Sequence, residues 1–249
     1  MRKVIINADD FGLTMGCSLG IIKALKEGLV TSTTIMMNMP KTKDSIQLAK
    51  ENMINAMGVH LNLTAGRPLS PTNEIPSLLD KQGRFNKTNI YPSKTLNLNE
   101  VERELERQIN AFLDNKLELT HLDSHHHVHM NKGIKDVCID LARKYDLPLR
   151  LPHIGNIKSD AEYGIVTPHS LSCDFYNEGA TMEQFKKIID GIARGITEIM
   201  THPGIVDDEL TRVSSYNHKR GRELEILTDK RLIDWMGEKD IQLISFKDL

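Results

Sequence analysis

Residues 4–39 read VIINADDFGLTMGCSLGIIKALKEGLVTSTTIMMNM. The apolar run Val4–Asn7 predicts a buried strand, and Thr31–Met39, which is rich in threonine, predicts a second strand. Between them, apolar residues recur at helical spacing over Ile21–Leu29. Because two strands separated by a helix usually pair in parallel, this unit indicates an α/β fold.

The alternation of strand and helix patterns continues toward the C-terminus. Further strands are predicted at Met57–Leu63, Leu119–Asp123, Leu149–Leu151, Ile196–Met200 and Ile241–Phe246, and further helices at 43–51, 99–113 (capped by Asn99), 134–141, 181–192 (opened by Thr181) and 219–237. Repeated units of this kind in 249 residues favour a (β/α) barrel, which typically has ~250 residues. We therefore expect one catalytic domain over residues 1–249.

The periodic patterns stop between residues 66 and 98. Four prolines, at 68, 71, 76 and 92, together with Gly83 and Asn86, interrupt every strand or helix pattern there. We expect an excursion of irregular loops with a short hairpin. Long irregular segments of compact domains often form binding loops or lids.

Charge and cysteine content narrow the class of protein. With 32 Lys and Arg against 34 Asp and Glu, the net charge is -2, which argues against general binding of nucleic acids or anionic lipid. Three widely spaced cysteines form neither a disulfide framework nor a CxxC metal site. No apolar segment approaches the ~20 residues of a membrane span, and the first apolar run is too short for a signal peptide. We expect a cytoplasmic protein.

Polar residues occur where several predicted strands end. Asp9 and Asp10 follow the first strand, His60 lies on the third, and His125 and His202 each follow a later strand. Each has a simpler explanation, such as a turn residue, a helix cap or a buried core histidine. In a parallel barrel, however, the carboxyl ends of the strands converge on the face where active sites are built. The shared position therefore predicts one common site.

The run HHHVH at residues 125–129 places four imidazoles within five residues inside the chain. Such density is typical of metal sites. One carboxylate and two neutral imidazoles, with open positions for water and substrate, suit Zn²⁺, Fe²⁺, Co²⁺ or Mn²⁺, and Mg²⁺ if water completes the shell. The pattern is typical of a catalytic site and not of a closed structural one.

Three motifs resemble those of a known family. NADDFG (residues 7–12), GVHLNLT (58–64) and THLDSHHHVH (120–129) look like the signatures of the YdjC-like carbohydrate deacetylases, the family of chitooligosaccharide deacetylase. Residues 31–34 and 215–224 also resemble that family, so the likeness runs over nearly the whole chain in order. The family is similar in design to the NodB-type polysaccharide deacetylases, which implies a distorted (β/α) barrel.

The resemblance implies a role for each matching residue. Asp10, His60 and His125 would hold one divalent metal ion, Mg²⁺ or Zn²⁺. Asp9 would be the general base, and His202 would be the general acid. The implied reaction is removal of N-acetyl groups from short sugars that contain N-acetylglucosamine, of the chitooligosaccharide or diacetylchitobiose type.

Other residues carry weaker implications. Arg150 looks like an arginine that orients the base, and we also count it with His127 and His129 as a candidate substrate contact. The NodB-type pattern spaces two metal histidines four residues apart, so His129 is an alternative to His125 as the third ligand. His126 and His127 are expected to form walls near the substrate.

The nature of the substrate stays open at this level. Aromatic residues make up 5% of the chain, with Trp235 as the single tryptophan, which favours a small, soluble amino sugar over a long polymer. Arg67, Arg212 or Arg220 are candidates to bind a phosphorylated sugar. A homodimer is expected only because it is the commonest oligomer.

Two alternatives remain open at this stage. The His-x-His pairs within the run are typical of amidohydrolase-like and other metallohydrolases, although those pairs usually lie on the first barrel strand. A histidine-rich metal-storage or metal-sensing protein would bind several ions per chain and would not need Asp9.

Overall fold

Seven parallel strands form one sheet in the described residues, 1–86, 96–151 and 163–249, of this computed structural model. The strands are β1 (Arg2–Phe11), β2 (Ser32–Ile35), β3 (Ala56–Leu61), β4 (Glu118–Ser124), β5 (Ser170–Ser172), β6 (Gly195–Thr201) and β7 (Gln242–Leu243). Their order is β4-β3-β2-β1-β6-β5, and β7 pairs with β1.

β1 lies at the centre of the sheet and is buried from Val4 to Phe11. Its side chains enter hydrophobic clusters on both faces, since Ile6 belongs to the main core while Ile5 packs with Phe246. A strand covered on both faces requires a continuous apolar run, and VIIN provides it. The predicted first strand is therefore confirmed, with longer bounds.

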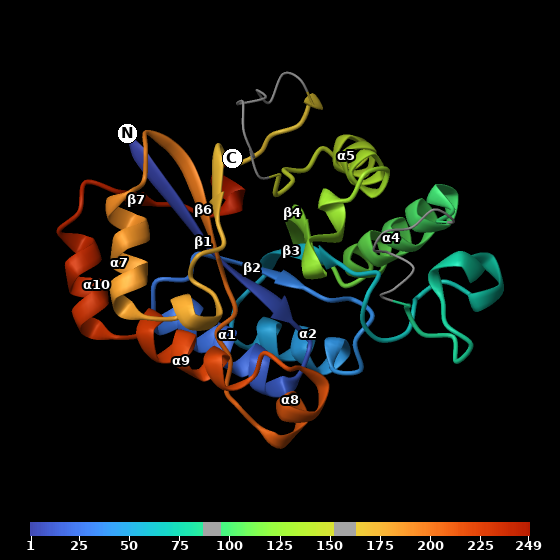
Figure 1. Cartoon of the computed structure of the whole chain (residues 1–249), viewed down its shortest axis with the longest axis horizontal. Helices are drawn as coiled ribbons and strands as arrows, with labels where there is room; N and C mark the ends of the chain where they lie inside the picture. Colours follow the sequence, from blue (N-terminus) through green and yellow to red (C-terminus); the bar gives the residue numbers. More distant parts are fainter. Residues whose placement is uncertain (87–95, 152–162) are drawn as a thin grey trace.

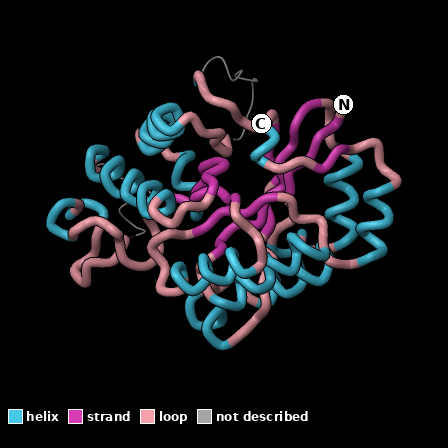
Figure 2. Tube along the Cα trace, turned by 180° about the vertical axis from the view of Figure 1, so that it is seen from behind, coloured by secondary structure: helices cyan, strands magenta, loops and turns pink. Residues whose placement is uncertain are grey.

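Helices surround the sheet, as both views of the chain show (Figure 1, Figure 2). They are α1 (Met15–Glu27), α2 (Thr42–Glu51), α4 (Leu98–Leu113), α5 (Ile134–Tyr145), α7 (Met182–Asp190), α8 (Asp208–Val213), α9 (His218–Leu227) and α10 (Lys230–Gly237). α1 packs against both α2 and α9, and α4 packs against α5. The short α8 was not predicted.

Several predicted helix boundaries were wrong, and two of them show the physical reason. Asn97, and not Asn99, caps α4, because the Asn97 side chain accepts a hydrogen bond from the backbone N–H of Asn99 at 3.1 Å. The helix predicted over 219–237 is divided into α9 and α10. Asp229 caps the second of these, accepting a bond from the N–H of Arg231 at 2.8 Å. Both differences arise from local side-chain caps.

No continuous hydrogen-bonded ladder closes the sheet into a barrel among the described residues. The strand predicted at Leu149–Leu151 is reduced to one parallel bridge between Leu149 and Leu122 on β4. The N–H of Leu149 also donates to the carbonyl of Val166 at 3.0 Å, four residues before β5. This bond connects the β4 edge with the segment that leads into β5, a strand that we did not predict. The α/β fold class is confirmed.

The excursion after residue 66 is irregular where the structure describes it. Residues 66–86 contain two 3-10 turns, η1 (Thr72–Glu74) and η2 (Pro76–Leu78), and an antiparallel bridge between Leu79 and Phe85. Residues 87–95, including position 92, lie outside the described residues. Among the described residues, no helix combines the length and the apolar character that crossing a bilayer requires. A single catalytic domain stays a prediction.

Candidate active site

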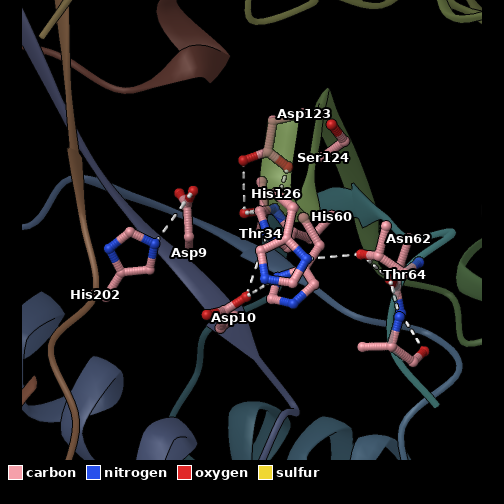
Figure 3. A network of polar contacts seen from close by, with 12 residues as sticks. Asp9, Asp10, Thr34, His60, Asn62, Thr64, Asp123, Ser124, His126 and His202 are labelled. Carbon is pink, nitrogen blue, oxygen red and sulfur yellow. Dashed lines mark hydrogen bonds and ion pairs between the residues drawn. The ribbon is translucent and has the colours of Figure 1, made fainter. Parts of the chain in front are cut away.

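The structure brings the five predicted site residues to one cavity of about 1130 Å³. Asp9 and Asp10 lie at the end of β1, and His60 lies near the end of β3. His125 follows β4 and His202 follows β6. In the close-up, the side chains of Asp9, Asp10, His60 and His202 gather where these strands end (Figure 3).

Asp10 lies between two imidazoles and one guanidinium. Its Oδ1 is 3.2 Å from Nε2 of His60 and 2.9 Å from Nδ1 of His125, and its Oδ2 is 2.6 Å from Arg220. Burial would raise the pKa of Asp10, but His125 and Arg220 hold it well below its usual range. Asp10 adopts a φ of 70°, a left-handed conformation that is rare outside glycine and is often found at functional sites.

His60 is held by Asp123 and Thr34, two residues to which the sequence analysis assigned no role. Its Nδ1 is 2.8 Å from Oδ1 of Asp123 and 3.2 Å from the hydroxyl of Thr34. The strands β3 and β4 pair so that His60 and Asp123 are direct neighbours. Burial would lower the pKa of His60, but Asp123 and Asp10 raise it to about 10. A carboxylate behind a histidine is the usual outer partner of a metal ligand.

Asp9 forms a two-pronged ion pair with Arg150. The two distances are 2.6 Å and 2.7 Å, and Arg150 also contacts Asp123 at 3.1 Å and Glu198 at 2.6 Å. Burial would raise the pKa of Asp9, but Arg150 overrides this effect and holds it well below its usual range. Arg150 is fully buried and is not among the cavity-lining residues, so its contacts are with the carboxylates.

His202 lies beside Asp9 on the cavity wall. Its Nε2 is 4.0 Å from Oδ2 of Asp9, and its backbone N–H donates to buried Glu223. Its ring meets the rings of Tyr176 and Tyr216 edge to face. Burial lowers the pKa of His202 to about 3, so this imidazole is neutral around pH 7.

The four histidines of the run have different surroundings, although the ring centroids of His125 and His126 lie 3.9 Å apart. His126 and His127 both have left-handed φ values, 53° and 52°, which turn successive side chains in different directions. His126 and His127 line the cavity, as expected for wall residues. His129 is fully buried, is not a cavity-lining residue, and contacts Ser124. Substrate contact by His129 or Arg150 stays a prediction, since both side chains are buried and neither lines the cavity.

Two groups of side chains in the described residues could hold a cation: Asp10, His60 and His125, or Asp9, His60 and Asp123. Within each group, the ligand atoms lie within 4.8 Å of one another. Arg150 pairs with both carboxylates of the second group, whereas Arg220 pairs with one oxygen of Asp10 in the first group and leaves the other facing the two histidines. All three residues of the first group line the cavity, where substrate and water could reach a bound ion. The first group therefore fits a catalytic metal better, and it contains His125 and not His129.

The outer part of the cavity is lined by side chains suited to a polar sugar. Arg67, Arg84 and Arg212 are exposed on its rim, and Tyr176 stacks on Tyr216 with ring centroids 4.2 Å apart. Arg84 and both tyrosines were not predicted as site residues. Tyr216 lies within residues 215–224, which resemble the family, but the resemblance implied no role for it. Arg84 and Tyr176 lie outside the motifs that we identified.

Comparison with known proteins adds independent support. Residues 3–238 match the family model described as YdjC-like protein. A carbohydrate deacetylase from Brevibacillus brevis is 39% identical over 99% of both chains. Another, from Thermoanaerobacter pseudethanolicus, is 35% identical over 100% of both chains.

Two solved structures resemble this chain. One, from Enterococcus faecalis V583, is named for cellobiose-phosphate cleavage; it has a TM-score of 0.91 and 36% identity, and the match covers 99% of this chain and 98% of that one. The other is a Xyl-CE4 xylanase domain from the hindgut metagenome of Trinervitermes trinervoides, with a TM-score of 0.52 and 9% identity over 99% of this chain and 88% of that one. The second shares the fold alone. The matches over the full length of the chain show that this protein belongs to the YdjC-like family, whose curated relatives compared here are carbohydrate deacetylases.

Proposed function

We propose that this carbohydrate deacetylase depends on one divalent metal ion and removes the acetyl group from an N-acetylglucosamine unit of a short sugar. The observation that carries the proposal is the placement of Asp10, His60 and His125 around one point of the cavity, with Asp9 and His202 beside it. The family and its curated relatives support the reaction class.

Asp10, His60 and His125 would hold the ion, and their surroundings suit that task. Asp10 is charged because its pKa is lowered, and Asp123 fixes the ring of His60 so that its Nε2 faces Asp10. A divalent cation bound there would polarise the acetyl carbonyl and lower the pKa of a coordinated water. Mg²⁺ and Zn²⁺ remain the two expected ions, and imidazole ligands favour Zn²⁺.

Asp9 and His202 would move the proton. Asp9 is ionised because Arg150 lowers its pKa, and it would take a proton from the attacking water. His202 is neutral and its Nε2 lies 4.0 Å from Asp9, which is beyond direct hydrogen-bond distance, so a bridging water would pass the proton to Nε2 for delivery to the departing amine. Arg150 keeps the Asp9 carboxylate in place during this transfer.

The direct test is acetate release from N,N′-diacetylchitobiose, free and phosphorylated, with the metal-stripped enzyme resupplied with Mg²⁺, Zn²⁺, Co²⁺ or Mn²⁺. We expect acetate only when a cation is added. Release of acetate that is insensitive to chelation would contradict metal dependence. Failure to deacetylate either sugar with any of these ions would contradict the proposed substrate class.

We further propose that the substrate carries a phosphate at the arginine rim. Support comes from Arg67, Arg84 and Arg212 on one cavity and from the relative named for cellobiose-phosphate cleavage. Arg212→Met should raise KM for the phosphorylated sugar about 10-fold or more, because a charge-assisted bond is worth ~1.5–3 kcal/mol. KM for the free sugar should not change. Equal effects on both sugars, or any comparable effect of the control Arg107→Met on exposed α4, would refute a phosphate role.

Cation binding should release a proton at neutral pH. The pKa of His60 is raised to about 10 without a metal, so this ring is protonated at pH 7 and must become neutral to bind the ion. Calorimetric titration in buffers of different ionisation enthalpy should show release of about one proton per ion. Affinity should therefore increase from pH 7 toward pH 10. A cation affinity that is independent of pH over this range would argue against His60 as a ligand.

The rival readings receive less support. The metal-storage alternative expects several ions per chain, whereas a single group of cavity-lining ligands is present in the described residues. The amidohydrolase alternative relies on His-x-His pairs, but His127 and His129 are not in either candidate cation group. A cytoplasmic location and a homodimer stay predictions, and the three free cysteines are consistent with the former.

A further inference from the structure

Helix α9 carries two pairs of arginine and glutamate with the same spacing but opposite surroundings. Arg220 and Glu223 face the interior and are 3% and 0% exposed. Arg222 and Glu225 face solvent and are 56% and 71% exposed. Residues three apart lie on one face of a helix, so each pair occupies its own side of α9. The buried pair reaches the candidate site, and the exposed pair provides a matched reference.

The two carboxylate oxygens of Asp10 have different partners because Arg220 binds only one of them. Its guanidinium is 2.6 Å from Oδ2, while Oδ1 faces His60 and His125. The Nε of Arg220 also donates to the carbonyl of Tyr216 at 2.8 Å, which fixes the direction of the guanidinium. Asp10 is thereby held with one oxygen toward the ligand group and the other turned away from it.

Glu223 anchors the neighbourhood of His202 in a comparable way. One of its oxygens accepts a bond from the backbone N–H of His202, and the other accepts a bond from the hydroxyl of Tyr216. The Tyr216 ring packs edge to face against the His202 ring, with centroids 5.7 Å apart. The Nδ1 of His202 is buried and has no hydrogen-bond partner among the described residues. The position of its ring therefore depends on this backbone anchor and on the tyrosine wall.

We propose that Arg220 and Glu223 are positioning residues that serve the two halves of the reaction centre separately. Arg220 sets the carboxylate of Asp10 so that it offers a single oxygen to the cation. Glu223 sets His202 for proton donation to the amine. This inference rests on the proposed function, because it assigns the roles by which that function is carried out.

The separation of roles can be measured with Co²⁺, whose visible spectrum reports the geometry of its ligands. Arg220→Met should change the spectrum of the bound ion and lower kcat, since Asp10 is then free to rotate. The substitution also removes a positive charge near the ion, which changes the cation affinity whether or not Asp10 moves. The test therefore rests on the Co²⁺ spectrum and not on the affinity. Loss of a residue that hydrogen-bonds to a metal ligand typically lowers metal affinity or activity by ~10–100-fold.

Glu223→Leu should leave the Co²⁺ spectrum unchanged while kcat falls by ~10²-fold, the cost of a misplaced catalytic group. Glu223→Gln keeps an acceptor for the His202 N–H and should recover most of that loss. If Glu223→Leu does not fold, as judged by circular dichroism, Glu223→Gln is used instead. It should show a modestly lowered kcat and an unchanged Co²⁺ spectrum. Arg220→Lys is the corresponding fallback for Arg220→Met. It keeps the positive charge but lacks the planar guanidinium, so the Co²⁺ spectrum should still change.

Arg222→Met and Glu225→Gln should leave the spectrum, kcat and KM unchanged. The proposal is overturned if Arg220→Met lowers kcat with an unaltered spectrum, or if Glu223→Leu alters the spectrum as much as Arg220→Met does. It is also overturned if the substitutions at Arg222 and Glu225 change the spectrum or kcat as much as those at Arg220 and Glu223 do. Failure of the unmodified protein to bind Co²⁺ or to release acetate would instead refute the proposed function.

Discussion

His60→Ala is expected to lose the bound cation and the deacetylase activity together. The side chain supplies one of three candidate ligands, and Asp123 holds it toward Asp10. A catalytic cation contributes several kcal/mol to transition-state stabilisation, so kcat/KM should fall by about 10³-fold or more. Metal content by mass spectrometry and acetate release at saturating cation measure the two losses.

His127→Ala is the matched control for this prediction. His127 lines the same cavity but is not in either candidate cation group, so this variant should keep one ion per chain. Loss of the ion from both variants would favour a diffuse histidine patch, as expected of a storage protein. Retention of the ion and of full activity in His60→Ala would rule out His60 as a ligand.

Asp9→Asn should reduce kcat by ~10²–10⁴-fold, the usual contribution of a general base, while the cation stays bound. The amide is nearly the same size as the carboxylate but cannot accept the proton of the attacking water. Asp9 is not in the Asp10 ligand group, so its replacement leaves those ligands unchanged. Turnover and metal content of the same sample provide the comparison.

The substitution also weakens the ion pair with Arg150, so a loss of stability has to be separated from a loss of chemistry. Glu198→Gln removes another carboxylate from the same guanidinium, away from the cavity lining; because burial raises the pKa of Glu198 to about 7, the two variants are compared above pH 8, where Glu198 is ionised. It should change thermal stability in a similar way but lower kcat much less than Asp9→Asn does. An Asp9→Asn enzyme with normal turnover, or equal losses in the two variants, would exclude Asp9 as the base.

The principal strands and the gathering of the site residues were predictable because both depend on short-range patterns. Alternation of apolar runs with helical spacing identified β1, β3, β4 and β6, and parallel strands must bring their carboxyl ends to one face. Asp10, His60 and His125 were therefore expected to converge, and they do. Helix ends were less predictable, as Asn97 and Asp229 show, because several residues near each end could serve as caps.

The supporting contacts could not be predicted in the same way. Thr34 reaches Asp123 across 89 positions of the chain, and Arg220 reaches Asp10 across 210. Neither pairing leaves a periodic signal near either residue. The burial of Arg150 among Asp9, Asp123 and Glu198 likewise depends on how distant strands pack.

By itself, the sequence determined the class of fold, the positions of the principal strands along the chain and the residue types available at their ends. Those features follow from local hydrophobic periodicity and from the geometry of parallel strands. Only the tertiary structure decided that His125 and not His129 faces Asp10, that Arg150 is buried behind Asp9, and that α9 reaches the site. These outcomes depend on where side chains point once distant segments pack, and no local pattern encodes that direction.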